Sequence, residues 1–331
     1  MVTQKDIAGK LGISRSLVSR AIAGTAGDIG ASEETVRRIR RMAEKCGYMP
    51  NAAAQSLRGA STMTIGVVVK DFTDPFFGKM VGEIQALGRD RGFSLLLAGY
   101  SGDGGHQPDT RSLLRYSPDA LIICGSHVNT SWLKPFITKG IPAVQIGSGK
   151  NCLGLSRVEM DEVFGISLLL GHLKSLGHRE LGFIGADTEP LLKRKKLFSD
   201  LAREQGMLLK YSVSVPEQYG AGCLAMKNLI GLSGRNLPTA VIAADDMTAQ
   251  CGLKALHDAG LHVPEDISLT GIDDIPSAGL MIPALTTIRS PVAEMVRAAF
   301  SLAVDRKKGR EPRVVKIKPE LIVRESCSKT I

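Results

Sequence analysis

Few residue clusters in this sequence have the types and spacing that catalysis requires. Residues 147–151, Gly-Ser-Gly-Lys-Asn, are similar to a phosphate-binding loop, but the upstream glycine and the hydroxyl residue after the lysine are missing. The six histidines form no His-Glu-x-x-His metal motif, and no Gly-x-Ser-x-Gly nucleophile elbow is present. We therefore predict that the protein is not an enzyme and uses neither a metal nor a cofactor.

Basic residues near the N-terminus indicate a different chemistry, the binding of a polyanion. Residues 1–60 hold ten Lys or Arg against five Asp or Glu, a net charge of +5 out of +9 for the chain. Arg15 and Ser16 begin the second of two short helices joined at Gly12, as in a helix-turn-helix, and an arginine there can bind guanine bidentately. Two ordinary core helices with a solvated basic face would give the same pattern.

The elements that must position these residues follow from local signals. Thr3 and Asp6 form a capping box, and Ser14 and Ser32 can cap the next two helices. A short helix is expected at 51–58. From Thr64 onward apolar strands alternate with amphipathic helices, which predicts parallel sheets covered on both faces. Strands are expected at 64–70, 93–98, 119–124, 142–146, 180–185, 239–244 and 267–272, and helices at 76–91, 108–116, 130–139, 161–176, 191–206, 221–232 and 246–260.

Composition narrows the class of protein further. The chain has 331 residues, 44% hydrophobic and 23% charged, which is typical of globular domains. Its N-terminus is polar and its apolar runs are too short for a membrane span, so we expect a cytoplasmic protein without membrane contact. The six cysteines are widely and irregularly spaced, which indicates neither a disulfide framework nor a zinc site.

Many short motifs, taken together, resemble the lactose-repressor (LacI/GalR) family of bacterial transcription regulators. In the first sixty residues they are Asp6-Ile7-Ala8, Gly12-Ile13-Ser14, Val18-Ser19-Arg20, Ser32-Glu33-Glu34-Thr35, Gly47-Tyr48-Met49-Pro50-Asn51 and Ala54-Gln55-Ser56-Leu57-Arg58. Further motifs are Asp74-Pro75-Phe76-Phe77, Gly177-His178-Arg179, Val263-Pro264-Glu265-Asp266, Gly271-Ile272-Asp273-Asp274, Leu285-Thr286-Thr287-Ile288 and Leu321-Ile322-Val323-Arg324-Glu325-Ser326. The resemblance spans essentially the whole chain.

The resemblance implies a set of DNA contacts. Arg15 and Ser16 match the family's variable base-reading pair, and Arg20 matches a common DNA-contacting arginine. Leu57 matches the hinge leucine that enters the minor groove and kinks the operator, although alone it reads as a helix-packing residue. Further contacts are implied for Thr3, Ser19, Asn51, Gln55 and Arg58.

The resemblance also implies a small-molecule effector in a cleft between two subdomains. Asp161, Arg194, Asp245 and Asp273 match pocket positions and lie beyond expected strand ends, where such sheets bind ligands. Carboxylates and a guanidinium suit a polyhydroxylated ligand. Asp161 and Asp245 can also be helix caps, Asp273 a turn residue, and Arg194 part of a solvated basic face, although its spacing to the aromatic Phe198 favours the pocket. Phe76 and Phe77 can stack on a sugar ring or belong to the core.

Departures from the family pattern affect these expectations. The loop between Arg20 and Ser32 is about three residues longer than usual, and its effect on DNA contacts is undetermined. Asp245 stands where asparagine is common, which removes an amide donor and adds charge.

The sequence thus predicts an α/β protein with three parts: a helix-turn-helix headpiece at 1–50, a hinge helix and linker at 51–62, and an effector domain at 63–331, built from two doubly wound parallel sheets like a periplasmic binding protein. We expect a homodimeric repressor that binds double-stranded operator DNA and is controlled by a sugar-like effector. A transport receptor or a sugar-processing enzyme of the same fold are the alternatives. Effector identity, the sign of the response, and the operator with its target genes are not determined by the sequence.

Overall fold

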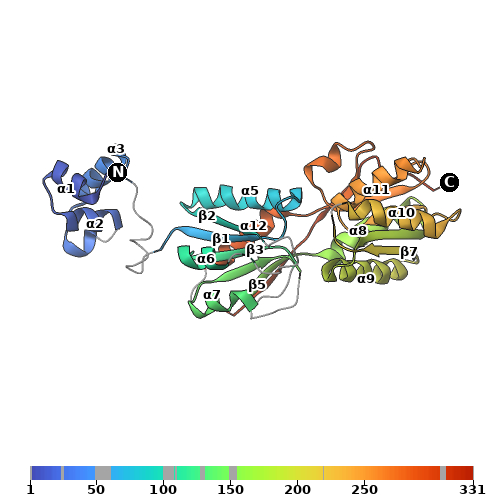
Figure 1. The fold of residues 1–331 in the computed structure, drawn as a ribbon, viewed down its shortest axis with the longest axis horizontal. Helices are drawn as coiled ribbons and strands as arrows, with labels where there is room; N and C mark the ends of the chain where they lie inside the picture. The colour runs from blue at the N-terminus through green and yellow to red at the C-terminus, as the bar shows by residue number, and fades with distance from the viewer. Residues whose placement is uncertain are drawn as a thin grey trace. The chain divides into compact units, whose positions relative to one another are not determined.

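The computed structural model describes residues 2–23, 26–48, 61–99, 108, 110–126, 131–148, 155–218, 220–305 and 311–330. Contacts between residues divide the chain into two units, Met1–Met63 and Thr64–Ile331 (Figure 1). The expected helix at 51–58 and the predicted DNA contacts Asn51, Gln55, Leu57 and Arg58 lie outside the described residues.

The first unit is a small helical domain with its own core. Its elements are α1 (Gln4–Leu11), α2 (Arg15–Ala23), the 3-10 helix η1 (Ala26–Ile29) and α3 (Glu33–Lys45). The predicted capping box of Thr3 and Asp6 is present, and Gly12 ends α1 in the left-handed conformation at φ +66°. The tight turn at Gly12 and the buried contacts of Ile7, Val18 and Ile39 hold the three helices as a helix-turn-helix.

In its described residues, the second unit contains two six-stranded sheets with equivalent strand orders. The first sheet has the order β11-β5-β4-β3-β1-β2, and all of its strand pairs are parallel. Its strands are β1 (Thr64–Val69), β2 (Ser94–Gly99), β3 (Ala120–Cys124), β4 (Ala143–Ile146), β5 (Ser156–Met160) and β11 (Val314–Ile317). We call this sheet and its helices lobe 1.

The second sheet, with its helices, forms lobe 2. Its order is β12-β10-β9-β8-β6-β7, in which β12 alone pairs antiparallel to its neighbour. Its strands are β6 (Glu180–Ala186), β7 (Leu208–Val215), β8 (Ala240–Ala243), β9 (Ser268–Asp273), β10 (Thr286–Arg289) and β12 (Glu320–Ile322). The predicted fold class, a headpiece followed by two doubly wound lobes, is confirmed.

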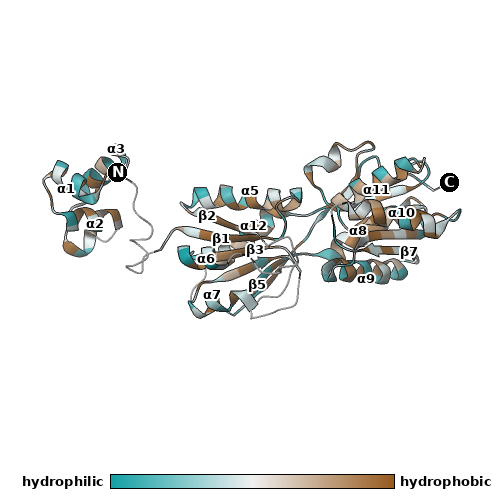
Figure 2. Cartoon of the chain, viewed as in Figure 1, coloured by the Kyte–Doolittle hydropathy of each residue, from teal (hydrophilic) through white to brown (hydrophobic). Residues whose placement is uncertain are grey.

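Helices cover both faces of each sheet, as expected for strands that are apolar on both sides (Figures 1 and 2). Lobe 1 has α5 (Pro75–Asp90), α6 (Thr110–Tyr116), η2 (Ser131–Leu133), α7 (Lys134–Thr138) and α12 (Val292–Val304). Lobe 2 has α8 (Glu162–Ser175), α9 (Glu189–Glu204), α10 (Ala221–Ser233), α11 (Asp246–Asp258) and the 3-10 helix η3 (Pro276–Gly279). None of the described helices is long and apolar enough to cross a membrane.

Three connections link the lobes, after β5, after β10 and after β11. They contact one another, since the amide of Asp161 donates to the carbonyl oxygen of Ile317 at 2.8 Å. The hydroxyl of Ser290, on the second connection, lies 3.3 Å from the sulfur of Met160, on the first. The three connections therefore lie in contact with one another where they join the lobes.

From residue 64 onward the expected helices and strands are present with small shifts at their ends, and β5 coincides with the stretch 154–160 expected to be strand-like. The strands β7, β10, β11 and β12, the helix α12 and the 3-10 helices η1 and η3 were not predicted. The segment expected as a helix at 130–139 is divided into η2 and the short α7. The longer loop between Arg20 and Ser32 contains the 3-10 helix η1.

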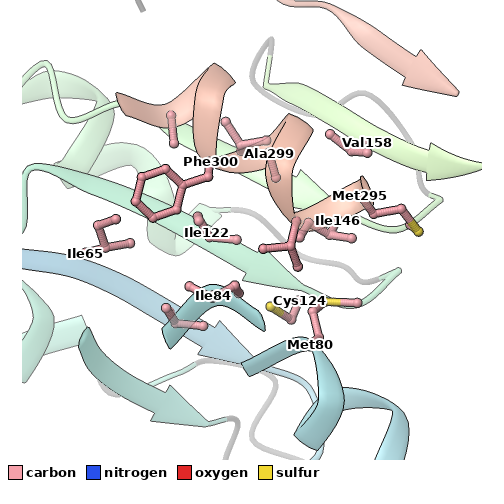
Figure 3. Packing of buried hydrophobic residues seen from close by; sticks show 14 of the residues in the cluster. Ile65, Met80, Ile84, Ile122, Cys124, Ile146, Val158, Met295, Ala299 and Phe300 are labelled. Carbon is pink, nitrogen blue, oxygen red and sulfur yellow. The ribbon is translucent and has the colours of Figure 1, made fainter. Parts of the chain in front are cut away.

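Helix α12 is central to the core of lobe 1, although it follows lobe 2 in the chain. Figure 3 shows Met295, Ala299 and Phe300 of α12 packed over residues of the sheet and of α5. Phe300 is fully buried and meets Phe93 edge to face, with ring centroids 5.8 Å apart.

We predict that Phe300→Ala lowers the free energy of unfolding by about 3–5 kcal/mol, because it leaves a cavity where the sheet and two helices meet. Tyr116→Ala removes an aromatic ring that is 58% exposed in the same lobe and should cost less than about 1 kcal/mol. Urea unfolding of both variants measures the difference. Equal losses would contradict the central role of α12.

Candidate functional site

A cavity of about 170 Å³ lies between the lobes, at the carboxyl ends of the strands. Residues from both lobes and from two of the connections line it. They are Lys70, Asp71, Asp74, Phe76, Phe77, Met80, Gly125, Ser126, Ile146, Gly147, Ser148, Met160, Glu162, Thr188, Pro190, Leu191, Arg194, Glu217, Asp245, Asp273, Ser290 and Met295. The structure thus brings together five of the six residues predicted for the effector: Phe76, Phe77, Arg194, Asp245 and Asp273.

Arg194 is a buried charge in the wall of the cavity. Its guanidinium donates to the carboxylate of Glu162 through two nitrogens, at 2.5 and 3.2 Å, and to the carbonyl oxygen of Ala244 at 2.7 Å. Burial opposes its charge, but the carboxylates of Glu162, Asp273 and Asp245 outweigh that effect and raise its pKa. Arg194 therefore remains charged and fixed in place.

Two lobe 2 carboxylates lie near Arg194. Asp245 is the N-cap of α11 and accepts a hydrogen bond from the amide of Thr248 at 2.7 Å, so it caps a helix and also lines the cavity. Asp273 ends β9 and accepts from the hydroxyl of Ser290 at 2.9 Å. Burial raises the pKa of Asp273, and the charge of Arg194 opposes this rise. The site concentrates hydrogen-bond acceptors around one positive charge.

The backbone at Asp273 is strained. Asp273 and the next residue, Asp274, have φ values of +117° and +53°, which residues other than glycine rarely adopt. Asp274 is held by Arg289 and Arg324, at 2.7 and 2.6 Å. This pairing fixes the turn that points Asp273 toward the second connection between the lobes.

Lobe 1 contributes acidic and aromatic groups. Asp74 caps α5, accepting from the amide of Phe76 at 2.9 Å, and Asp71 accepts from Thr73. Burial raises the pKa of Asp74 to about 6, and the negative charge of Asp245 on the other lobe adds to the rise. Phe76 contacts the cores of both lobes and meets Phe77 edge to face.

One ion pair joins the two lobes beside the cavity. The ammonium of Lys70, directly after β1, lies 2.7 Å from a carboxylate oxygen of Glu217, after β7. The two cations among the described lining residues, Lys70 and Arg194, are thus both paired with glutamates. Asp71, Asp74, Asp245 and Asp273 remain as acidic groups without a neutralising ion pair in that lining.

Several lining residues were not predicted from the sequence. Lys70, Asp71, Ser126 and Ser148 follow β1, β3 and β4, so the rule that ligands bind beyond carboxyl strand ends would have found them. The hydroxyl oxygen of Thr188 is buried in the cavity wall and has no hydrogen-bond partner among the described residues. An unsatisfied buried hydroxyl in a cavity indicates a missing polar partner.

Two expectations about the cavity need correction. Asp161 is absent from the described cavity lining, and its carboxylate instead caps α8 by accepting from the amide of Phe164 at 3.1 Å. Its neighbour Glu162 lines the cavity in its place. Phe198 is fully buried against Phe183 in the core of lobe 2, so its spacing to Arg194 was not a signal for the cavity.

The headpiece presents its predicted base-reading residues on the outer face of α2. Arg15, Ser16 and Arg20 are exposed, while Val18 and Ala21 on the opposite face are buried. Ser19 is half-buried, and the exposed hydroxyl of Thr3 donates to Asp6 at 2.7 Å. The orientation of α2 leaves its basic face available to a partner.

Comparison with known proteins matches this arrangement. Residues 170–327 match the family model described as a periplasmic binding protein-like domain. The chain is 30% identical to the HTH-type transcriptional regulator DegA of Bacillus subtilis, over 98% of this chain and 97% of that protein. It is 31% identical to the HTH-type transcriptional regulator GalR of Escherichia coli, over 99% and 96% of the two chains.

A solved structure covers the same length. The transcriptional regulator CelR in complex with cellobiose superposes with a TM-score of 0.68 and 27% identity, over 98% of this chain and all of that one. A helix-turn-helix headpiece and a two-lobed binding domain are thus shared from end to end. The chain belongs to the LacI/GalR family of transcriptional regulators.

We predict that Asp74→Asn raises the free energy of unfolding at about pH 8 by about 1–2 kcal/mol, since asparagine keeps the helix cap and removes a carboxylate that is costly to ionise. In the native protein the pKa of the Asp74 carboxyl is raised from 3.8 to about 6. The gain in stability should therefore shrink as the pH falls through 6 toward 4. Denaturant unfolding at several pH values measures it.

Asp266→Asn provides the opposite control. Hydrogen bonds from His262 lower the pKa of Asp266. At pH values above the pKa of this carboxyl in the unfolded chain, the substitution should therefore lower the free energy of unfolding instead of raising it. A gain for Asp74→Asn that is independent of pH would refute the ionisation argument.

Proposed function

We propose that this protein is a homodimeric repressor whose affinity for operator DNA is controlled by an uncharged sugar bound in the cavity. Residues 1–50 act as the DNA-binding headpiece, 51–62 as the hinge and linker, and 63–331 as the effector domain. Operator binding places its action in the cytoplasm. The observation that carries the proposal is a cavity of polar acceptors between two lobes, in a chain of this family.

The chemistry of the cavity supports a polyhydroxylated effector. Asp245 and Asp273 can accept from sugar hydroxyls, and the hydroxyl of Thr188 offers a further polar contact. Phe76 and Phe77 supply an apolar surface against which a pyranose ring can pack. The CelR structure, solved with cellobiose, is an independent precedent for a sugar in a relative.

The charge of the cavity favours an uncharged effector over a phosphorylated one. Lys70 and Arg194 are engaged by Glu217 and Glu162, and four aspartates remain in the described lining. A phosphate would meet repulsion from these carboxylates without an available counter-charge among them. Sugar acids are disfavoured for the same reason.

Effector binding can bias the lobes because the cavity touches their connections. Asp273 contacts Ser290 on the second connection, and Ser290 contacts Met160 on the first. A ligand held by Asp273 is therefore linked through these side chains to two of the three connections. A ligand shifts such an equilibrium only through different affinities for its two states. The same coupling makes operator and effector affect each other reciprocally.

The homodimer is proposed from the operator geometry and an exposed apolar segment. Repressors with helix-turn-helix headpieces bind half-sites about one helical turn (~34 Å) apart. In lobe 2, Leu280 and Ile282 are 81% and 92% exposed, which is unusual for side chains of this size. A second copy would cover them.

The first test is operator binding. Duplexes selected from a random library, or the DNA upstream of the coding sequence, should yield a pseudopalindromic site. Arg15→Ala should then cost about 1–3 kcal/mol and relax preference at one base pair in each half-site, as measured by fluorescence anisotropy.

Arg37→Ala is the matched control for Arg15→Ala, because it removes the same charge from α3 and breaks exposed contacts with Glu33. Its effect should be smaller and independent of sequence. Equal weakening of all sequences by Arg15→Ala would mean that Arg15 contacts only the phosphate backbone.

The second test is effector specificity. Cellobiose and other neutral sugars are compared with their phosphorylated forms by thermal shift and calorimetry, and a neutral sugar is expected to bind. Asp273→Asn should lower its affinity ten- to a hundredfold, equivalent to about 1.5–3 kcal/mol, and leave effector-free operator affinity nearly unchanged.

Asp161→Asn is the control for the effector site, because its carboxylate also belongs to lobe 2 but only caps α8. It should bind the sugar like the wild type. Tighter binding of the phosphorylated form would contradict the charge argument. Absence of a pseudopalindromic site would contradict the proposal that the protein is a homodimeric repressor.

A further inference from the structure

Two cysteines that are 28 residues apart in the sequence meet between α10 and α11. The thiol of Cys223 on α10 donates to the backbone carbonyl of Cys251 on α11, with the sulfur 3.0 Å from the oxygen. Both side chains are half-buried free thiols. They lie on the same face of the lobe 2 sheet, outside the described lining of the cavity.

Gly222 explains how the two helices approach so closely. A Cβ atom at this position would lie 2.5 Å from the carbonyl oxygen of Thr248 and 2.9 Å from the Cβ of Cys251. The backbone of α10 therefore packs directly against α11, which brings the residue after Gly222 next to Cys251. Close approach of the backbones is the condition that a disulfide between neighbouring helices must meet.

We propose that Cys223 and Cys251 form a reversible disulfide when the protein meets a peroxide. The geometry, the thiol of one cysteine in contact with the backbone of the other across a glycine-packed helix interface, carries the inference. Disulfides in reducing compartments are usually transient and redox-sensing. The inference concerns thiol chemistry, so it stands apart from the identity of operator and effector.

The two thiols differ in ways that assign their order of reaction. Burial raises the pKa of Cys251 to about 11, and the neighbouring Cys223 contributes, so Cys251 is a poor first nucleophile. The ammonium of Lys254, held by Asp258, also interacts electrostatically with Cys223. Cys223 is thus the thiol that meets the oxidant, and Cys251 resolves it.

The reaction balances in two steps. The Cys223 thiolate attacks hydrogen peroxide, an S–O bond forms while the O–O bond breaks, and the released hydroxide takes a proton to become water. The Cys251 sulfur then attacks the sulfenic sulfur of Cys223. The S–S bond forms as the S–O bond breaks, and the second water leaves with the proton of Cys251. A thiol reductant reverses the product.

The bond would join two helices that each follow a cavity-lining residue in the chain. Asp245, the N-cap of α11, lines the cavity, and Glu217 lies just before α10. The disulfide would therefore limit movement of α10 relative to α11 behind these carboxylates.

The test uses the full-length protein. After treatment with hydrogen peroxide and alkylation of the remaining thiols, peptide mass mapping should find one intramolecular link between residues 223 and 251, reversed by dithiothreitol. Cys327→Ser should retain the link, whereas Cys223→Ser and Cys251→Ser should each abolish it. Oxidation should raise the melting temperature of the wild type and of Cys327→Ser only.

Trapping of the sulfenic acid distinguishes the roles of the two thiols. This measurement does not require the disulfide to be stable. Dimedone should label residue 223 in Cys251→Ser and leave residue 251 unlabelled in Cys223→Ser. Recovery of both cysteines as alkylated thiols in oxidised wild type would overturn the proposal, as would linkage of either one to another cysteine. Labelling of residue 251 would overturn the assigned order.

Discussion

The buried guanidinium of Arg194 is the interaction on which the cavity depends. Three carboxylates from different segments, those of Glu162, Asp245 and Asp273, come close together around it, and they would repel one another in its absence. Arg194 also binds the carbonyl oxygen of Ala244, which immediately precedes the cap of α11. One side chain thereby ties α8, α9 and the start of α11 into a single wall.

This constraint is matched by a second one at Asp273. The strained backbone there persists because Asp274 is held by two arginines, and Asp246 accepts hydrogen bonds from the amide of Ile275 and the hydroxyl of Thr287. Burial raises the pKa of Asp246 to about 7, because the charged carboxylate is less stable in the interior than in water. The turn after β9 is thus fixed from several sides, so Asp273 keeps its direction toward Ser290.

Much of the fold follows from sequence patterns, and the misses have physical causes. The unpredicted strand β7 lies at a sheet edge and is mostly only half-buried, so it lacks the apolar run that marked the central strands. Helix α12 has a clear apolar pattern at helical spacing, but chain order would assign it to lobe 2. Only the tertiary structure places it on the sheet of lobe 1.

For the cavity, the match to the family's pocket positions correctly predicted that Arg194, Asp245 and Asp273 line it. The same match failed for Asp161, because a carboxylate at the start of a helix can either cap the helix or face a ligand, and here the next residue, Glu162, faces the cavity. The pairing of Lys70 with Glu217 joins residues 147 positions apart, and no local signal predicts such a contact.

The three connections also determine when each part can fold during synthesis. The headpiece is continuous in the chain, so its core is complete once its helices have left the ribosome. Lobe 1 needs α12 and β11, and lobe 2 needs β12, all of which come after residue 291. Neither lobe can complete its sheet until these residues have been synthesised. A nascent chain therefore holds a folded headpiece long before it holds the receptor that would regulate it.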